Sequence, residues 1–160
     1  MHEFIFPLRR YRTGISIIET VVVAAIVLLL AYMVLASFSQ FRIKKTMDAA
    51  VEEVLAAFSQ AHLDTIASKN SQQYGVHLDA NSVVYYIGPT YVADTSTNIS
   101  YAIHPVLEIA NITLAGGGVN VLFNRLTGGT SQAGTFEVRQ KGNSAVRTII
   151  TVNGTGAISL

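Results

Sequence analysis

The first strong pattern along the chain is a long apolar run near its start. From Thr20 to Phe41 there is no charged residue, and this stretch exceeds the roughly 20 residues that an α-helix needs to cross a bilayer core of about 30 Å. The remaining residues are too few to bury a helix that is apolar on every side. The pattern therefore predicts a membrane-inserted helical segment over residues 15–41.

Beyond this run, the pattern becomes that of an amphipathic helix. Apolar residues recur at three- and four-residue spacing at Ile43, Met47, Val51, Val54, Leu55, Phe58 and Ile66. The charged residues Lys44, Lys45, Asp48, Glu52, Glu53 and Asp64 lie mostly off this stripe. No Gly or Pro occurs from Ile15 to Tyr74, so nothing interrupts a helix there. We expect one helix of about 50 residues, whose second half (residues 42–70) packs on a globular head.

From Tyr74 onward the pattern changes to short β-rich runs separated by turns. We expect strands at Tyr74–Leu78, Ser82–Ile87, Leu107–Leu114, Val119–Asn124, Thr135–Gln140, Ala145–Val152 and Ala157–Leu160. The polar stretch Thr90–Pro105 is expected to be a surface loop, and Asn153-Gly154 to supply the positive φ of a tight hairpin turn. The sequence thus predicts an α+β fold, with a long N-terminal helix packed on a C-terminal head (residues 71–160) that is an antiparallel sheet or a small sandwich.

Composition and charge refine this picture at the N-terminal end. The chain contains no cysteine, which excludes a disulfide framework and thiolate metal sites. Arg9, Arg10 and Arg12 precede the apolar run, and basic residues there favour a cytoplasmic N-terminus. Arg42, Lys44 and Lys45 on the far flank weaken that argument, so charge alone leaves the orientation open.

One carboxylate, Glu19, stands at the start of the apolar run. A lone ionised acid in the bilayer centre costs about 2.5–3.5 kcal/mol on insertion scales, so a carboxylate in such a run needs a partner. One interpretation from the residue alone is a headgroup-level Glu, which is favourable near the positive end of a helix. A second interpretation, in which Glu19 has a charged partner, depends on the residues that surround Glu19 in the sequence.

At this junction the chain resembles the prepilin family, which comprises type IV pilins and type II secretion pseudopilins. The resemblance is carried by the basic leader, Gly14, and the following Ile15-Ser16-Ile17-Ile18-Glu19-Thr20. It implies that a prepilin peptidase cuts after Gly14, removes residues 1–14 and methylates the new amine of Ile15. Family members most often have Phe at the position of Ile15 and a basic residue at the position of Thr13, so the chain departs from the pattern at both.

The resemblance also gives Glu19 a role in recognition and assembly. In a bundle of parallel helices, the carboxylate of Glu19 on one subunit can meet the positive amine of Ile15 on its neighbour, and the two charges neutralise each other. The implied function is a structural subunit that assembles through its N-terminal helix into a type IV pilus or a type II secretion-type pseudopilus. The implied partners are the prepilin peptidase, other subunits, the assembly platform of the cytoplasmic membrane and the lipid bilayer, and the head is expected on the periplasmic or extracellular side.

A second, looser resemblance concerns the head. Phe123, the glycines at 128, 129 and 134, and Gly156 resemble the strand, Gly-rich loop and final hairpin of H-type minor pseudopilins and their pilus relatives. A minor subunit is favoured over a major pilin because the cysteine pair common in major pilins is missing. The membrane helix also lacks the Pro or Gly that interrupts it in many major pilins.

Catalytic and cofactor-binding motifs are not found, and we expect neither enzymatic activity nor a cofactor. His2, His62, His77 and His104 are isolated and lack metal-ligand spacing, so no metal site is predicted. We expect His62, beside the apolar stripe, to be a packed residue. The tyrosines of the head are compatible with an adhesive surface or, more ordinarily, with packing on strands.

Nucleic-acid binding is the remaining question of chemistry. Arg139, Lys141 and Arg147 are candidates for a weak basic patch, and scattered solvated charges are the simpler interpretation. Nucleic acid is therefore not a favoured partner. The rival function is a membrane-tethered β domain that binds a ligand or DNA and never polymerises, and an archaeal-type pilin or archaellin is a third alternative.

Overall fold

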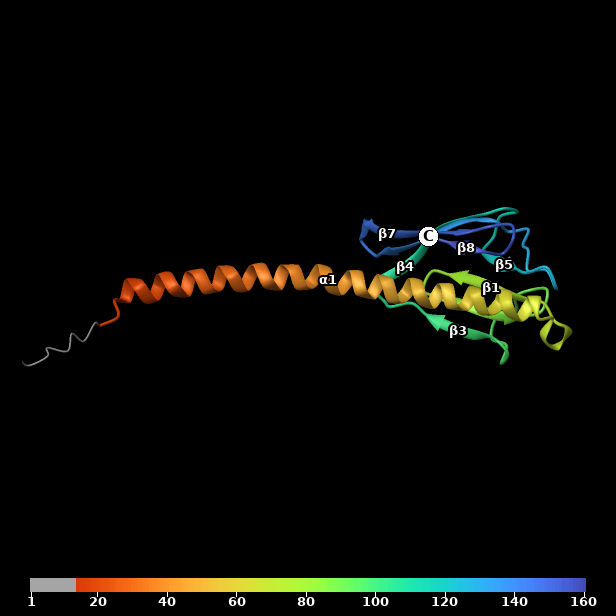
Figure 1. The fold of residues 1–160 in the computed structure, drawn as a ribbon, viewed down its shortest axis with the longest axis horizontal. Coiled ribbons are helices and arrows are strands. Elements are labelled where there is room, and N and C mark those ends of the chain that lie inside the picture. Colours follow the sequence, from red (N-terminus) through yellow and green to blue (C-terminus); the bar gives the residue numbers. More distant parts are fainter. Residues whose placement is uncertain (1–13) are drawn as a thin grey trace, which may run out of the picture. The chain divides into compact units, whose positions relative to one another are not determined.

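A computed structural model describes residues 14–160, and for residues 36, 37, 39 and 40 it describes the backbone alone. Within these residues, one α-helix, α1 (Ile17–Ile66), is followed by a 3-10 turn, η1 (Lys69–Ser71), and then by eight strands (Figure 1). The chain divides into two compact units, Met1–Phe41 and Arg42–Leu160. The predicted uninterrupted helix is confirmed.

The first unit contains the apolar part of α1. Ile17–Leu35 has a mean hydropathy of 2.7, and none of it is buried within the protein. Its length and composition suit a membrane-spanning helix, and the side chains of its aliphatic residues are largely exposed. Such a helix needs an apolar environment from outside the chain.

The second half of α1 is the amphipathic helix that the spacing predicted. One face is buried, at Met47, Ala50, Val51, Val54, Ala57, Phe58, Ala61 and Thr65. The predicted stripe is wrong at Ile66, which is 39% exposed. Thr65 is buried instead, and its side-chain oxygen accepts a hydrogen bond from the backbone N–H of Tyr74 at 3.2 Å. A polar residue is tolerated there because this bond satisfies its hydroxyl.

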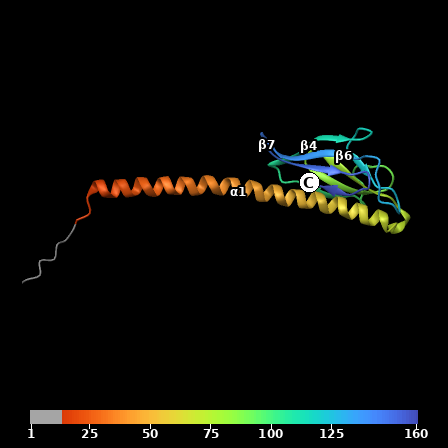
Figure 2. The same cartoon turned by 45° about the horizontal axis from the view of Figure 1, so that its top comes forward.

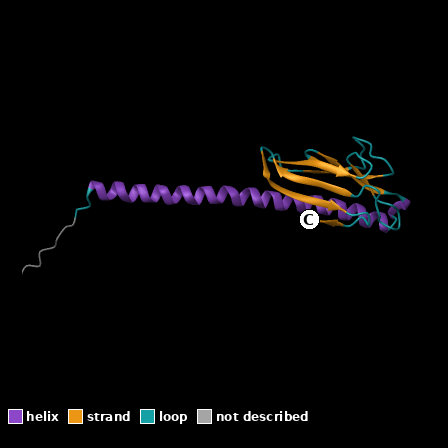
Figure 3. Ribbon diagram, turned by 90° about the horizontal axis from the view of Figure 1, so that it is seen from above, coloured by secondary structure: helices purple, strands orange, loops and turns teal. Residues whose placement is uncertain are grey.

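The strands form two four-stranded antiparallel sheets. The first contains β1 (Tyr74–Asp79), β2 (Ser82–Ile87), β3 (Ile99–Ala102) and β5 (Asn120–Leu122), in the order β3-β2-β1-β5. The second contains β4 (Leu107–Leu114), β6 (Gly134–Gln140), β7 (Asn143–Val152) and β8 (Ile158–Ser159), in the order β4-β6-β7-β8. In Figures 2 and 3 most strands lie on one side of α1. The predicted α+β fold is confirmed.

Two local predictions are wrong. The expected loop Thr90–Pro105 contains β3, which pairs with β2 at the edge of the first sheet. The final hairpin is present, but the positive φ in its turn belongs to Gly156 (+83°) rather than to Asn153 or Gly154. The five residues 153–157 that connect β7 and β8 are closed by a hydrogen bond from the Asn153 N–H to the Ala157 carbonyl at 2.8 Å.

The second half of α1 joins both sheets into one core. The Phe58 ring stacks on Phe136 of β6 at 5.7 Å and meets Phe123, just after β5, edge-on at 6.4 Å. All three are fully buried, and burial of one such side chain contributes about 1.5–3 kcal/mol. On the first sheet, the Tyr85 and Tyr101 hydroxyls donate to Asp64 (2.8 Å) and Gln60 (3.0 Å) of α1. The head therefore needs this part of the helix for its core.

Candidate functional site

The segment predicted for processing stands immediately before α1. Gly14 and Ile15 are exposed and non-helical, and a side chain added at Gly14 would meet no atom within 4 Å. The carbonyl of Ser16 accepts hydrogen bonds from the N–H groups of Glu19 (3.0 Å) and Thr20 (3.2 Å), so Ser16 occupies the helix N-cap position. The peptide bond after Gly14 is thus sterically accessible. The predicted leader residues Arg9, Arg10 and Arg12 lie outside the described residues.

Glu19 lies in the first turn of α1, where the helix dipole favours a carboxylate. Its side chain is exposed, and it shares one side of the helix with Ile15, Val23 and Val27. Within the part of the chain that is described, Glu19 makes no ion pair. The carboxylate therefore lies among apolar side chains, and no ion pair from residues 14–160 compensates its charge.

The structure brings two members of the predicted basic patch together. Arg139 of β6 and Arg147 of β7 are direct cross-strand partners. Each faces a carboxylate, because the Nε of Arg139 lies 2.8 Å from Glu108 and the Nε of Arg147 lies 3.8 Å from Glu137. Lys141, in the β6–β7 turn, donates to the Asn81 side chain at 2.8 Å. Most of the positive charge is therefore compensated locally.

The tyrosines of the head are packing residues. Tyr74, Tyr85 and Tyr86 are buried, and the Tyr74 and Tyr85 rings stack at 5.5 Å. Burial, followed by the hydrogen bond to the Asp64 carboxylate, raises the pKa of the Tyr85 hydroxyl well above its usual range. Burial raises the pKa of Tyr86 to about 12. The aromatic content of the head thus contributes to stability and leaves little aromatic surface for adhesion.

The described histidines, His62, His77 and His104, lie apart from one another in the head, and His2 lies outside the described residues. The His62 ring packs against Phe123 at 5.4 Å, and its Nε2 is buried without a hydrogen-bond partner among the described residues. His77 stacks on Tyr91 at 3.8 Å and shares a 2.6 Å hydrogen bond with Asn120, in which the His77 Nδ1 is the donor because the amide oxygen only accepts. Between Gly14 and Leu160, no group of three His, Asp or Glu side chains is placed to hold a metal ion.

Sequence reasoning missed one cluster on the outer face of the first sheet. Tyr91 returns from the loop after β2 to stack on His77 and to meet the Tyr86 ring edge-on at 5.6 Å. The alternation within β1 and β2 could have placed His77 and Tyr86 on one face. The return of Tyr91 had no signal in the sequence, because it depends on the path of an irregular loop.

The fold, in which a helix packs on two antiparallel sheets, is an α+β fold similar to that of a type IV minor pilin. Two crystal structures of the minor pilin FimU from Pseudomonas aeruginosa share it. One aligns with a TM-score of 0.57 at 13% identity, covering 75% of this chain and 91% of that chain. The other aligns with a TM-score of 0.53 at 13% identity, covering 71% and 90%. No family model matches the chain, and no curated protein matches it by sequence.

Proposed function

We propose that this chain is a structural subunit of a pilus or pseudopilus. The observation that carries the proposal is the combination of an exposed apolar helix, Ile17–Leu35, with a head of minor-pilin fold. The exposed aliphatic side chains need an apolar partner, which the bilayer supplies before assembly and the neighbouring helices supply afterwards. The proposed role is mechanical and not enzymatic.

Processing would occur at the start of this helix. A prepilin peptidase would cleave after Gly14 and methylate the amine of Ile15. The accessible, non-helical backbone at Gly14 supports this step, since a protease needs an extended substrate. Cleavage would leave residues 15–41 as the membrane anchor, with residues 42–70 and the head, residues 71–160, outside the membrane.

Assembly would depend on Glu19 and on the new amine of Ile15. The carboxylate lies one helical turn from its own amine, and in a bundle it would pair with the amine of the neighbouring subunit. Its exposure and its lack of an ion pair among the described residues support this role. The partners would be other subunits and the assembly platform in the cytoplasmic membrane, with the head on the periplasmic or extracellular side.

Within this class, the similarity to FimU supports a minor pilin of a type IV pilus. An H-type minor pseudopilin of a type II secretion system is the related alternative, carried by the resemblance at Phe123 and Gly156. The rival from another class is a tethered β domain that binds a ligand or DNA. Its support is weaker, because Arg139 and Arg147 face Glu108 and Glu137.

The assembly role is tested by Glu19→Ala in the full chain. We expect the variant to insert in the membrane and to be cleaved, but to lose most of its incorporation into filaments, because the amine of the neighbouring subunit would have no counter-charge in a low-dielectric bundle. Immunodetection of the subunit in sheared filaments measures this, with Glu19→Asp as the charge-conserving control. Normal incorporation of Glu19→Ala would favour the tethered-domain alternative.

A further inference from the structure

β3 is an open edge of the first sheet. It pairs with β2 on one side and has no strand on the other in the described part of the chain. The pairing runs from Tyr85 opposite Ile99 to Ser82 opposite Ala102 without a register shift. Ile99, Ser100 and Ala102 are exposed. An edge strand of this kind presents backbone groups to which another strand can bind.

The register shows which backbone groups of β3 face the open side. The N–H of Ile103, just after β3, donates to the carbonyl of Asn81 in the β1–β2 turn at 2.8 Å. Hydrogen-bonded residues alternate along an antiparallel pair, so Tyr101 also bonds to β2. The N–H and C=O groups of Ser100 and Ala102 therefore point away from β2. Among the described residues these groups have no hydrogen-bond partner.

The other three sheet edges are protected. β4 is interrupted by a bulge between Ala110 and Thr113, where Asn111 has a φ of +50°. In β5, the Leu122 N–H donates to the side-chain oxygen of Gln132 at 3.2 Å, and β8 is only two residues long. Bulges, covered edges and very short strands hinder the addition of a further strand, as do charged residues and prolines. β3 has no bulge, no charged residue and no proline, so it is the edge best suited to bind a strand.

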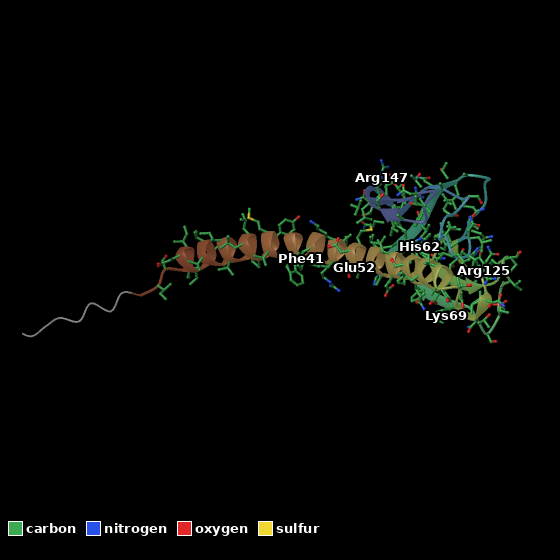
Figure 4. The ribbon with its side chains drawn as sticks, turned by 45° about the vertical axis from the view of Figure 1, so that its right-hand side comes forward. Phe41, Glu52, His62, Lys69, Arg125 and Arg147 are labelled. Atoms are coloured by element: carbon green, nitrogen blue, oxygen red, sulfur yellow. The ribbon has the colours of Figure 1, made fainter. Side chains whose placement is uncertain are left out.

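An open hollow of about 460 Å³ lies beside this edge, between β3 and α1. Its walls are Lys45, Thr46, Ala49, Ala50 and Glu53 of α1, together with Ala102 and His104. Figure 1 shows β3 alongside the second half of α1, and Glu52, labelled in Figure 4, lies on the stretch of helix that borders the hollow. Three of the lining residues are alanines, so the hollow has room for the side chains of an added strand.

We propose that β3 binds an extended segment of another protein, which joins the first sheet as a fifth strand. The backbone of the segment would pair with the outward N–H and C=O groups of Ser100 and Ala102. Side chains alternate along a strand, so every second side chain of the segment would enter the hollow. Ile99 and Val106, which are 44% and 40% exposed near the two ends of β3, would add apolar contact.

The lining of the hollow indicates the chemistry of the segment. One lysine and one glutamate line it, so their formal charges cancel and favour no charged side chain. The alanines and the methyl group of Thr46 favour aliphatic side chains at alternate positions of the segment. Backbone pairing would supply affinity for any extended segment, and the hollow would supply the preference.

A second copy of the chain fits this edge less well. Antiparallel pairing of β3 with β3 of another copy would reverse one head relative to the other, which is unfavourable for copies inserted in one bilayer with the same orientation. The inference concerns the head alone. It goes beyond the proposed filament role and does not depend on it.

The first test uses the full chain in phosphatidylcholine nanodiscs, with a phage-displayed library of random decapeptides as the probe. We expect enrichment of uncharged peptides with alternating aliphatic residues, and fluorescence anisotropy of a synthetic copy gives its Kd. Ser100→Pro should weaken binding about tenfold, because proline removes an outward N–H and its ring obstructs the incoming strand. Ser100→Ala is the matched control, since it keeps the backbone N–H and should bind as the wild-type chain does.

The second test locates the bound peptide on the wild-type chain, so it does not depend on the folding of a variant. Hydrogen exchange of single amides is followed by NMR in the same nanodiscs. Saturating peptide should slow exchange at Ser100 and Ala102 about tenfold, and should change exchange at Tyr101 less, because the Tyr101 N–H already bonds to β2.

Three results would overturn the proposal: no enriched peptide, binding that Ser100→Pro leaves unchanged, or protection of amides away from β3. Self-association of the chain that Ser100→Pro abolishes would assign the edge to a second copy and would also overturn it. None of these results bears on the filament role, because neither measurement involves Gly14, Ile15 or Glu19.

Discussion

Gly156 and Gly116 have nearly the same backbone conformation, with φ values of +83° and +82°, but very different surroundings. A Cβ on Gly156 would overlap the carbonyl oxygen of Gly128 and would lie 2.7 Å from the His62 ring. A Cβ on Gly116 would meet nothing within 4 Å. A comparison of alanine substitutions at the two glycines therefore separates the free-energy cost of the positive φ from the cost of steric crowding.

We predict that Gly156→Ala lowers the free energy of unfolding by about 1–3 kcal/mol more than Gly116→Ala does, because only the former forces atoms into a packed turn. Denaturant unfolding of the full chain in detergent, followed by circular dichroism, measures both. Equal losses for the two variants would mean that the final turn is not packed against His62 as described.

Tyr86 provides a pH-dependent test of packing in the first sheet. Its ring covers Gly75, and burial raises the pKa of its hydroxyl to about 12. Below about pH 10, Tyr86 is protonated in both the folded and the unfolded chain, so its contribution to the free energy of unfolding does not change with pH. As the pH rises from about 10 to about 12, the unfolded chain loses the proton first, and the folded state loses stability.

Tyr86→Phe should therefore reduce the loss of stability between about pH 8 and about pH 11.5. The free energy of unfolding at the two pH values measures the difference, and the loss that remains in the variant reports the other titrating groups, Tyr85 among them. If Tyr86→Phe and the wild-type chain lose the same free energy of unfolding between these pH values, the Tyr86 hydroxyl is not buried as described.

At the scale of the elements, α1 is where the sequence predicted the structure best. Its periodicity is local, so the apolar half, the buried stripe and the absence of a break could all be read from spacing. Ile66 is the exception, since Thr65 and not Ile66 faces the core, and that choice depends on a hydrogen bond to Tyr74, nine residues away. Such a contact has no periodic signal.

The strands were predicted less completely for the same physical reason. Most strand cores were found, but β3 was not, because Ile99–Ala102 is short and follows a polar segment. The division into two sheets also depends on long-range pairing, such as that of β1 with β5, which local patterns do not encode. The candidate basic patch could not be assessed from the sequence for the same reason. The ion pair between Arg139 and Glu108 depends on the register between β4 and β6.

The membrane role of the first half of α1 is tested by Val27→Arg. Val27 lies near the middle of Ile17–Leu35, where an arginine costs about 2.5–3.5 kcal/mol on insertion scales. We predict a clear loss of the fraction that floats with lipid vesicles, relative to Val27→Leu as the size-matched apolar control. Unchanged flotation of Val27→Arg would indicate that this segment does not cross the bilayer.

At the scale of the whole molecule, the proposed function gives each of the two units its own role. Residues 15–41 would hold the chain in the membrane and later in the filament, and the head would face outward to neighbours or cargo. The head core includes α1 residues such as Phe58, so a force applied through the helix would reach both sheets.

The most direct measurement is the intact mass and N-terminal sequence of the native protein extracted from the membranes of cells with an active prepilin peptidase. The proposal predicts a chain that begins at Ile15 and carries one methyl group on its amine. A chain that still begins at Met1 would contradict processing, would leave Glu19 as a headgroup-level residue, and would favour a tethered binding domain over a filament subunit.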